Sequence, residues 1–215
     1  MRVIGQAKDW MLLYAEAEIR PILQSAPALD RPASRALVAR LYPQHQLTEI
    51  ADGTLFEQAN PDDDRIYAGC FPGLTVACTG DASLDQPSQL GQRFLREARG
   101  RRLYLHAMHC VVDWFAYAIW DTDGTLVRAL SLSPMSGIVE DVGPRLDFEK
   151  PYWSGQQPLA AGGGDYPFPF HPLELGEVAL RTLFGFNYEG LYRHDDPDLE
   201  RIALAGFAIQ PTLGS

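Results

Sequence analysis

The fold class can be predicted from residues Leu103–Ser133, LYLHAMHCVVDWFAYAIWDTDGTLVRALSLS. This stretch begins with a long extended apolar segment and passes through a polar turn at Asp121 to Gly124. It then continues as a second segment, in which apolar and other side chains alternate. Two extended segments joined by a tight Asp/Gly turn are typical of an antiparallel hairpin, because glycine accepts the positive φ of such turns. We therefore expect an α+β domain with a largely antiparallel sheet.

The segments on either side of this stretch predict more strands and about three helices flanking the sheet. Strands are expected at 9–16 and, as two short runs around Phe71-Pro72-Gly73, within 65–79. Helices are expected at 31–41, 86–99 and 172–184. Each helix has a start signal and a stop signal: Asp30 and Pro43 for the first, Asp85 and Gly100 for the second, Pro172 and Gly185 for the third.

Length and composition predict one soluble globular domain over residues 1–215. The chain has 46% hydrophobic residues, enough to bury a sizeable core, and no internal repeat or long linker divides it. Its net charge of −10 repels phosphate backbones and anionic membrane surfaces, so we expect neither a nucleic acid nor a membrane as partner. The apolar run near the N-terminus is too short for a signal sequence or a membrane span, which predicts a cytoplasmic location.

No pattern in the sequence predicts a metal or a cofactor. Cys70, Cys78 and Cys110 lack CxxC spacing, so we expect buried free thiols. The acidic segment 60–65, NPDDDR, lacks the spacing of an EF-hand and is interpreted as a solvated turn. The segment 160–166, AAGGGDY, is interpreted as a glycine-rich loop, since no lysine follows it as in a phosphate-binding loop.

The segment 118–127, AIWDTDGTLV, resembles the first motif of the haloacid dehalogenase phosphatases. The resemblance implies that Asp121 would be the nucleophile and Asp123 the acid/base. We reject this interpretation, because the chain continues as another strand and Lys150 is the one lysine downstream. The later acidic pair, Asp195-Asp196, lacks the apolar strand that should present a magnesium-binding carboxylate. A hairpin turn, in which the aspartates bond to the local backbone, is the favoured alternative.

Four other segments carry a second resemblance: YAGCFPGLTV, RRLYLHAMHCVVDWFAYAIW, SLSPMSGIVEDVG and FPFHPLELGEVALRTLFGF. Together they resemble an uncharacterised bacterial domain family of about 200 residues, over roughly Lys8 to Ile209. The resemblance implies a single complete domain. It implies no activity, ligand or catalytic residue.

The candidate site centres on His109 and Asp113. Strand alternation places His106 and His109 on opposite faces, which disfavours a metal pair, whereas His109 and Asp113 can share a face. A carboxylate beside an imidazole is the arrangement that a general base requires. The alternative is that both histidines are buried among aromatic side chains and bonded to the backbone or to Asp113.

His171 and Glu174 complete the candidate catalytic set. They stand at the start of the last predicted helix, where helix capping is the favoured role. If that helix packs over the sheet, the two residues close a cleft with His109 and Asp113.

The sequence contains no complete catalytic constellation. The leading hypothesis is a non-catalytic acidic binding or immunity-like module, with a protein partner or a small-molecule ligand. The alternative is a small hydrolase that uses His109, Asp113, His171 and Glu174.

Overall fold

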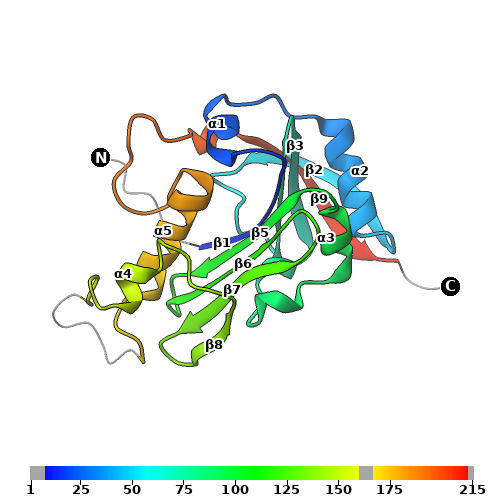
Figure 1. The fold of residues 1–215 in the computed structure, drawn as a ribbon. Coiled ribbons are helices and arrows are strands. Elements are labelled where there is room, and N and C mark those ends of the chain that lie inside the picture. The colour runs from blue at the N-terminus through cyan, green and yellow to red at the C-terminus, as the bar shows by residue number, and fades with distance from the viewer. Residues whose placement is uncertain (1–7, 160–166, 213–215) are drawn as a thin grey trace.

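In the part of the chain that the structure describes, the fold is built on one sheet of nine antiparallel strands, in the order β2-β9-β3-β4-β1-β5-β6-β7-β8 (Figure 1). The computed structural model describes residues 8–159 and 167–212. The strands are β1 Lys8–Ala15, β2 His45–Thr54, β3 Arg65–Phe71, β4 Leu74–Thr79, β5 Arg102–His109, β6 Trp114–Trp120, β7 Leu126–Ser133, β8 Gly137–Val142 and β9 Ala203–Pro211. The predicted α+β class and the antiparallel sheet are confirmed.

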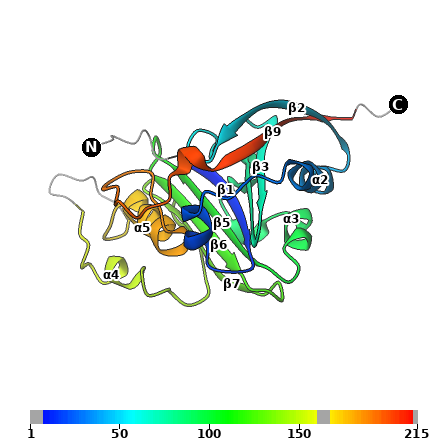
Figure 2. The same cartoon turned by 90° about the horizontal axis from the view of Figure 1, so that it is seen from above.

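Within the described residues, five α-helices cover the two faces of this sheet. They are α1 Ile19–Gln24, α2 Arg31–Leu41, α3 Gln92–Glu97, α4 Lys150–Trp153 and α5 Pro172–Phe184. Figure 2 shows α2 and α3 on one side of the sheet, with α1, α4 and α5 on the other. The short helices α1 and α4 have no counterpart in the sequence-based prediction.

Residues Leu103–Ser133 form three strands, β5, β6 and β7, and not the two that were predicted. The extended segment that was predicted to begin at Leu103 breaks at residues 110–113, because Asp113 adopts a left-handed backbone with φ +48°. His109 of β5 therefore pairs with Trp114 of β6 across a tight turn. The single long segment was thus a wrong prediction, and its two halves are neighbours in the sheet.

The second turn of the stretch agrees with the prediction. Gly124 has φ +85°. Asp121 accepts a hydrogen bond from the amide of Thr122 at 2.8 Å, and Asp123 accepts one from the amide of Thr125 at 2.8 Å. The DxDGT segment is therefore a hairpin turn that its own aspartates stabilise.

Two of the three predicted helices begin and end as expected. Asp30 accepts from the amide of Ala33 at 2.9 Å and caps α2. His171 caps α5, and Gly185 ends it with φ +87°. The middle helix was placed wrongly: α3 begins at Gln92 after Gly91, and Asp85 is not its cap. Pro87 begins a separate 3₁₀ turn, Pro87–Gln89.

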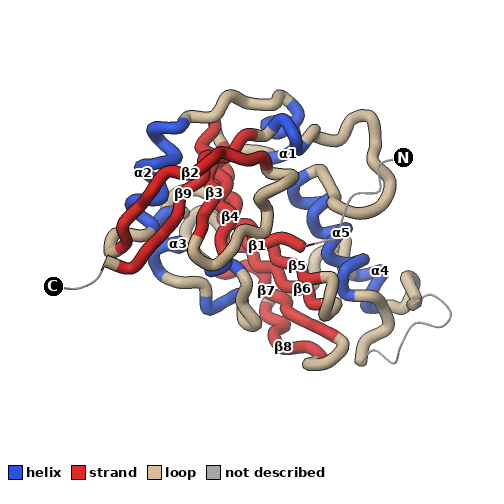
Figure 3. The backbone as a smooth tube through the Cα atoms, turned by 180° about the vertical axis from the view of Figure 1, so that it is seen from behind, coloured by secondary structure: helices blue, strands red, loops and turns tan. Residues whose placement is uncertain are grey.

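Two hydrophobic cores lie on opposite faces of the sheet. One lies between the sheet and α1, α4 and α5, and the other lies between the sheet and α2 and α3. Every residue of β4 and β6 is buried, since both of their faces are covered. Figure 3 shows β2 and β8 at the two edges of the sheet. In the described part of the chain, none of the helices has the length and apolar character to cross a bilayer.

Candidate functional site

His106 and His109 lie on opposite faces of β5, as the alternation predicts. The His106 ring is fully buried beneath α5. Its Nδ1 lies 2.8 Å from Oδ1 of Asp9, and its Nε2 lies 3.1 Å from the carbonyl oxygen of Gly176. This one ring therefore joins β1, β5 and α5.

The protons of this buried pair follow from its hydrogen bonds. The Gly176 carbonyl can only accept, so Nε2 of His106 carries a proton. The contact with Asp9 requires a second proton between Nδ1 and Oδ1, so the pair as a whole is neutral. Oδ2 of Asp9 is buried and has no hydrogen-bond partner among the described residues. Asp9 could not be predicted from the sequence, because a single aspartate at the start of an apolar strand forms no pattern with other residues.

His109 lies on the other face and packs against Trp10, with ring centroids 5.7 Å apart. Its Nδ1 accepts a hydrogen bond from the amide of Val111 at 3.2 Å. Partial burial, with a smaller contribution from the charge of Lys8, lowers the pKa of His109.

The histidine that approaches the Asp113 carboxylate is His171. Its Nε2 lies 3.7 Å from Oδ1 of Asp113, and both side chains are about one-third exposed, at 30% and 31%. Glu174 is exposed on α5, and its carbonyl oxygen accepts from the Tyr152 hydroxyl. Of the four predicted site residues, the structure thus brings Asp113 and His171 together.

The imidazoles of His109 and His171 share one hydrogen-bond pattern. In His171, as in His109, Nδ1 accepts from a backbone amide, here that of Leu173 at 3.2 Å. A neutral ring with this pattern carries its proton on Nε2 and has no free lone pair. Since a general base needs a free lone pair, this geometry favours a structural role for both rings, in the turn after β5 for His109 and at the start of α5 for His171.

A second buried charged group is also structural. Arg128 of β7 is fully buried and binds both carboxylate oxygens of Glu149, at 2.8 and 2.7 Å. It also donates to Asp141 at 2.5 Å, while the Tyr117 hydroxyl donates to Glu149 at 2.5 Å. These bonds satisfy the charge and join β7, β8 and the start of α4.

A cavity of about 530 Å³ opens elsewhere, between the loop 186–200 and the segment that follows β2. Its lining is mostly apolar and aromatic, with three carboxylates: Phe56, Phe186, Asn187, Gly190, Leu191, Tyr192, Asp196, Pro197, Asp198, Leu199 and Glu200. Leu191 is 82% exposed and Tyr192 is 55% exposed. We call this site the loop pocket.

Arg181 of α5 holds the loop of the pocket in place. Its guanidinium donates to both carboxylate oxygens of Asp196, at 2.8 and 3.1 Å, and to the carbonyl of Leu191 at 3.2 Å. Burial opposes ionisation of Asp196, but the bonds from Arg181 and from the amide of Arg193 hold its pKa below the ordinary value. The Tyr192 hydroxyl donates to the Asp196 carbonyl at 3.2 Å.

Glu177, one turn earlier on α5, holds the start of the same loop. Its two carboxyl oxygens accept from the amides of Tyr188 and Glu189, at 2.9 and 3.1 Å. Burial raises the pKa of Glu177 to about 8. The loop pocket could not be predicted from the sequence, because its residues show no periodicity and come from segments far apart in the chain.

The other expected features are placed as follows. Cys70, Cys78 and Cys110 are free thiols, of which Cys78 is fully buried and the others partly so. Within residues 8–159 and 167–212, no group of three or more His, Cys, Asp or Glu side chains is arranged to hold a metal ion. The glycine-rich segment 160–166 lies outside the described residues.

Fold and pocket together define an α+β protein with a nine-stranded antiparallel sheet and a pocket at one loop. Residues 9–207 match the model of the Family of unknown function (DUF6928), and the chain belongs to this family. This confirms the resemblance to a family without a known activity. No curated protein and no solved structure matches the chain.

Proposed function

We propose that this protein is a non-catalytic binding module that holds a small-molecule ligand in the loop pocket. The observation that carries the proposal is the cavity itself. Its volume of about 530 Å³ falls within the range of roughly 300–1,000 Å³ that is typical of ligand sites. Its lining combines an apolar wall with a few polar groups, as ligand sites do.

The bonds that fix the loop support this function. Arg181 and Glu177 tie the loop to α5, and Arg20 of α1 donates to Asp195 at 2.5 Å. A pocket whose wall is already ordered loses less conformational entropy when a ligand binds. Leu191 and Tyr192 remain exposed at the wall, where they offer apolar surface to a ligand.

The hydrolase alternative is less well supported. In its favour, Asp113 and His171 approach each other at a partly exposed position. Against it, backbone amides occupy Nδ1 of both His109 and His171, and Glu174 is exposed on α5. The immunity-like role with a protein partner draws its support from the net charge of −10 and from the exposed apolar side chains of the loop.

Ligand-observed NMR with a library of small apolar and aromatic fragments tests the proposal. We expect some fragments to bind to the wild-type protein. Tyr192→Ala and Leu191→Ala should each weaken this binding, because both changes remove apolar lining. Val111→Ala is the matched control, since Val111 is 74% exposed but belongs to the turn between β5 and β6. Fragment binding that neither pocket variant changes would contradict the proposal. Ester hydrolysis that depends on His171 would also contradict it.

A further inference from the structure

We propose that the ligand of the loop pocket is an organic cation, an amine or quaternary ammonium on an apolar or aromatic body. This inference rests on the proposed function and names the chemical class of its ligand. Two properties of the lining carry it: the aromatic rings and the sign of the charged side chains.

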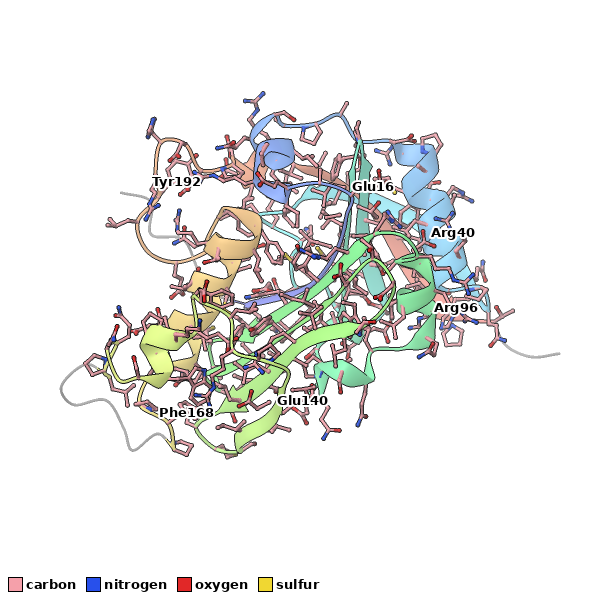
Figure 4. All side chains as sticks on the ribbon, in the orientation of Figure 1. Glu16, Arg40, Arg96, Glu140, Phe168 and Tyr192 are labelled. Atoms are coloured by element: carbon pink, nitrogen blue, oxygen red, sulfur yellow. The ribbon has the colours of Figure 1, made fainter. Side chains whose placement is uncertain are left out.

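Three aromatic side chains line the pocket, and they come from two distant parts of the chain. Phe56 follows β2, Phe186 follows α5, and Tyr192 lies further along the loop. Figure 4 labels Tyr192 on this loop, outside the sheet and away from Glu16. The face of an aromatic ring attracts a cation that lies within about 6 Å of its centroid, and recognition of quaternary ammonium groups uses such rings.

Among the residues that the structure describes, the charged side chains that line the pocket are all acidic. They are Asp196, Asp198 and Glu200, and this described lining contains no lysine, arginine or histidine. The charge of Asp196 is balanced by Arg181 behind it. Asp198 accepts from the amide of Glu200 at 3.2 Å and forms no ion pair within the described part of the chain. Asp198 therefore offers a negative charge to a ligand.

An anionic ligand is disfavoured for the same reason. It would lose its hydration on entering an apolar pocket and would meet carboxylates there. The net charge of −10 adds a long-range field that attracts cations and repels anions. A neutral ligand would gain the apolar contact but not the attraction to the rings and to Asp198.

Three probes with one shared body separate these cases. They are 4-phenylbutylamine, 4-phenylbutan-1-ol and 5-phenylpentanoate, each titrated into the full-length protein by calorimetry or NMR. We expect the amine to bind about tenfold more tightly than the alcohol and the pentanoate to bind more weakly than both. The preference for the amine should shrink as salt rises, since ions screen exposed charges.

Asp198→Asn gives the sharpest variant, because asparagine keeps an oxygen that can accept from the Glu200 amide. We expect this variant to lower the affinity for the amine by a factor of about 3 to 10 and to leave the affinity for the alcohol unchanged. Glu16→Gln is the matched control, since it removes one exposed carboxylate that does not line the pocket. It should leave all three affinities unchanged.

The outcomes distinguish this inference from the proposed function. If the alcohol or the pentanoate binds as tightly as the amine and Tyr192→Ala weakens it, the pocket is a ligand site and the cation preference is wrong. If no probe binds, or if binding is insensitive to Tyr192→Ala, the proposed function fails together with the inference. A loss of amine binding in Asp198→Asn but not in Glu16→Gln supports both.

Discussion

Nδ1 of His106 lies 2.8 Å from Oδ1 of Asp9, and the two fully buried side chains come from strands 97 residues apart in the chain. The pair joins β1 to β5 by a buried side-chain contact. The hydrogen bond from His106 to the Gly176 carbonyl also joins β5 to α5. Breaking a buried pair leaves one polar group without a partner in an apolar core, which costs more than an exposed pair ever contributes.

The first prediction concerns this pair. Asp9→Ala should destabilise the protein by about 3 kcal/mol or more and lower the melting temperature by roughly 10 °C. Thermal melts of Asp9→Ala, His106→Ala and the double variant measure the coupling. The double variant should cost less than the sum of the single ones by at least about 1 kcal/mol. Additive costs would show that the two side chains act independently.

The second prediction separates the backbone role of Asp113 from a catalytic one. Asp113 has φ +48°, a conformation that Asn and Gly accept and that Ala resists. We expect Asp113→Ala to cost about 1–2 kcal/mol, with Asp113→Gly and Asp113→Asn costing less. Chemical denaturation of the three variants measures their free energies of unfolding and so gives the order of their stabilities. Equal stability of all three, with loss of an esterase activity in each, would favour the hydrolase instead.

The third prediction concerns the Asp121–Gly124 turn. Gly124→Ala should cost about 1–2 kcal/mol, because φ is +85° while the space around a new Cβ is empty, so strain is the only penalty. Gly91→Ala is the control, since φ there is −57°. Asp121→Asn should leave the melting temperature nearly unchanged. A magnesium-dependent phosphatase activity that Asp121→Asn abolishes would refute the hairpin interpretation.

The fourth prediction is a dependence of stability on pH. The pKa of Glu177 is raised to about 8 in the folded protein, so between its ordinary value and pH 8 the folded state holds a proton that the unfolded state releases. The contribution of Glu177 to stability is therefore greatest at low pH and is lost as pH rises toward 8.

Melting temperatures of the wild type and Glu177→Gln, taken from pH 5 to 9, measure this effect. The lowered pKa of His109 contributes with the opposite sign, so the difference between the two proteins is the informative quantity. We expect Glu177→Gln to reduce the fall in stability with rising pH. Glu174→Gln, an exposed change one turn away on the same helix, should leave the pH profile as it is. Identical profiles for the wild type and Glu177→Gln would contradict the prediction.

Features that a few neighbouring residues specify could be predicted from the amino-acid sequence. The turn at Gly124, the start of α2 at Asp30 and the end of α5 at Gly185 all follow from side chains or backbone angles within a few positions. The opposite orientation of His106 and His109 follows from the two-residue period of a strand. A helix prediction from neighbouring residues was wrong where two signals conflict. Asp85 can cap a helix, but Pro87 and Gly91 interrupt the helix that would begin there.

Which side chains meet depends on the tertiary structure and could not be predicted from the sequence. His106 bonds to Asp9 because β5 pairs with β1 rather than with another strand, and strand order is set by packing over the whole sheet. The contact of Asp113 with His171 exists because the start of α5 lies near the turn between β5 and β6. The loop pocket joins Phe56 to residues 186–200, which have no common period or motif. Such long-range contacts follow from the fold as a whole, because the two partners lie too far apart in the chain for a local sequence pattern to relate them.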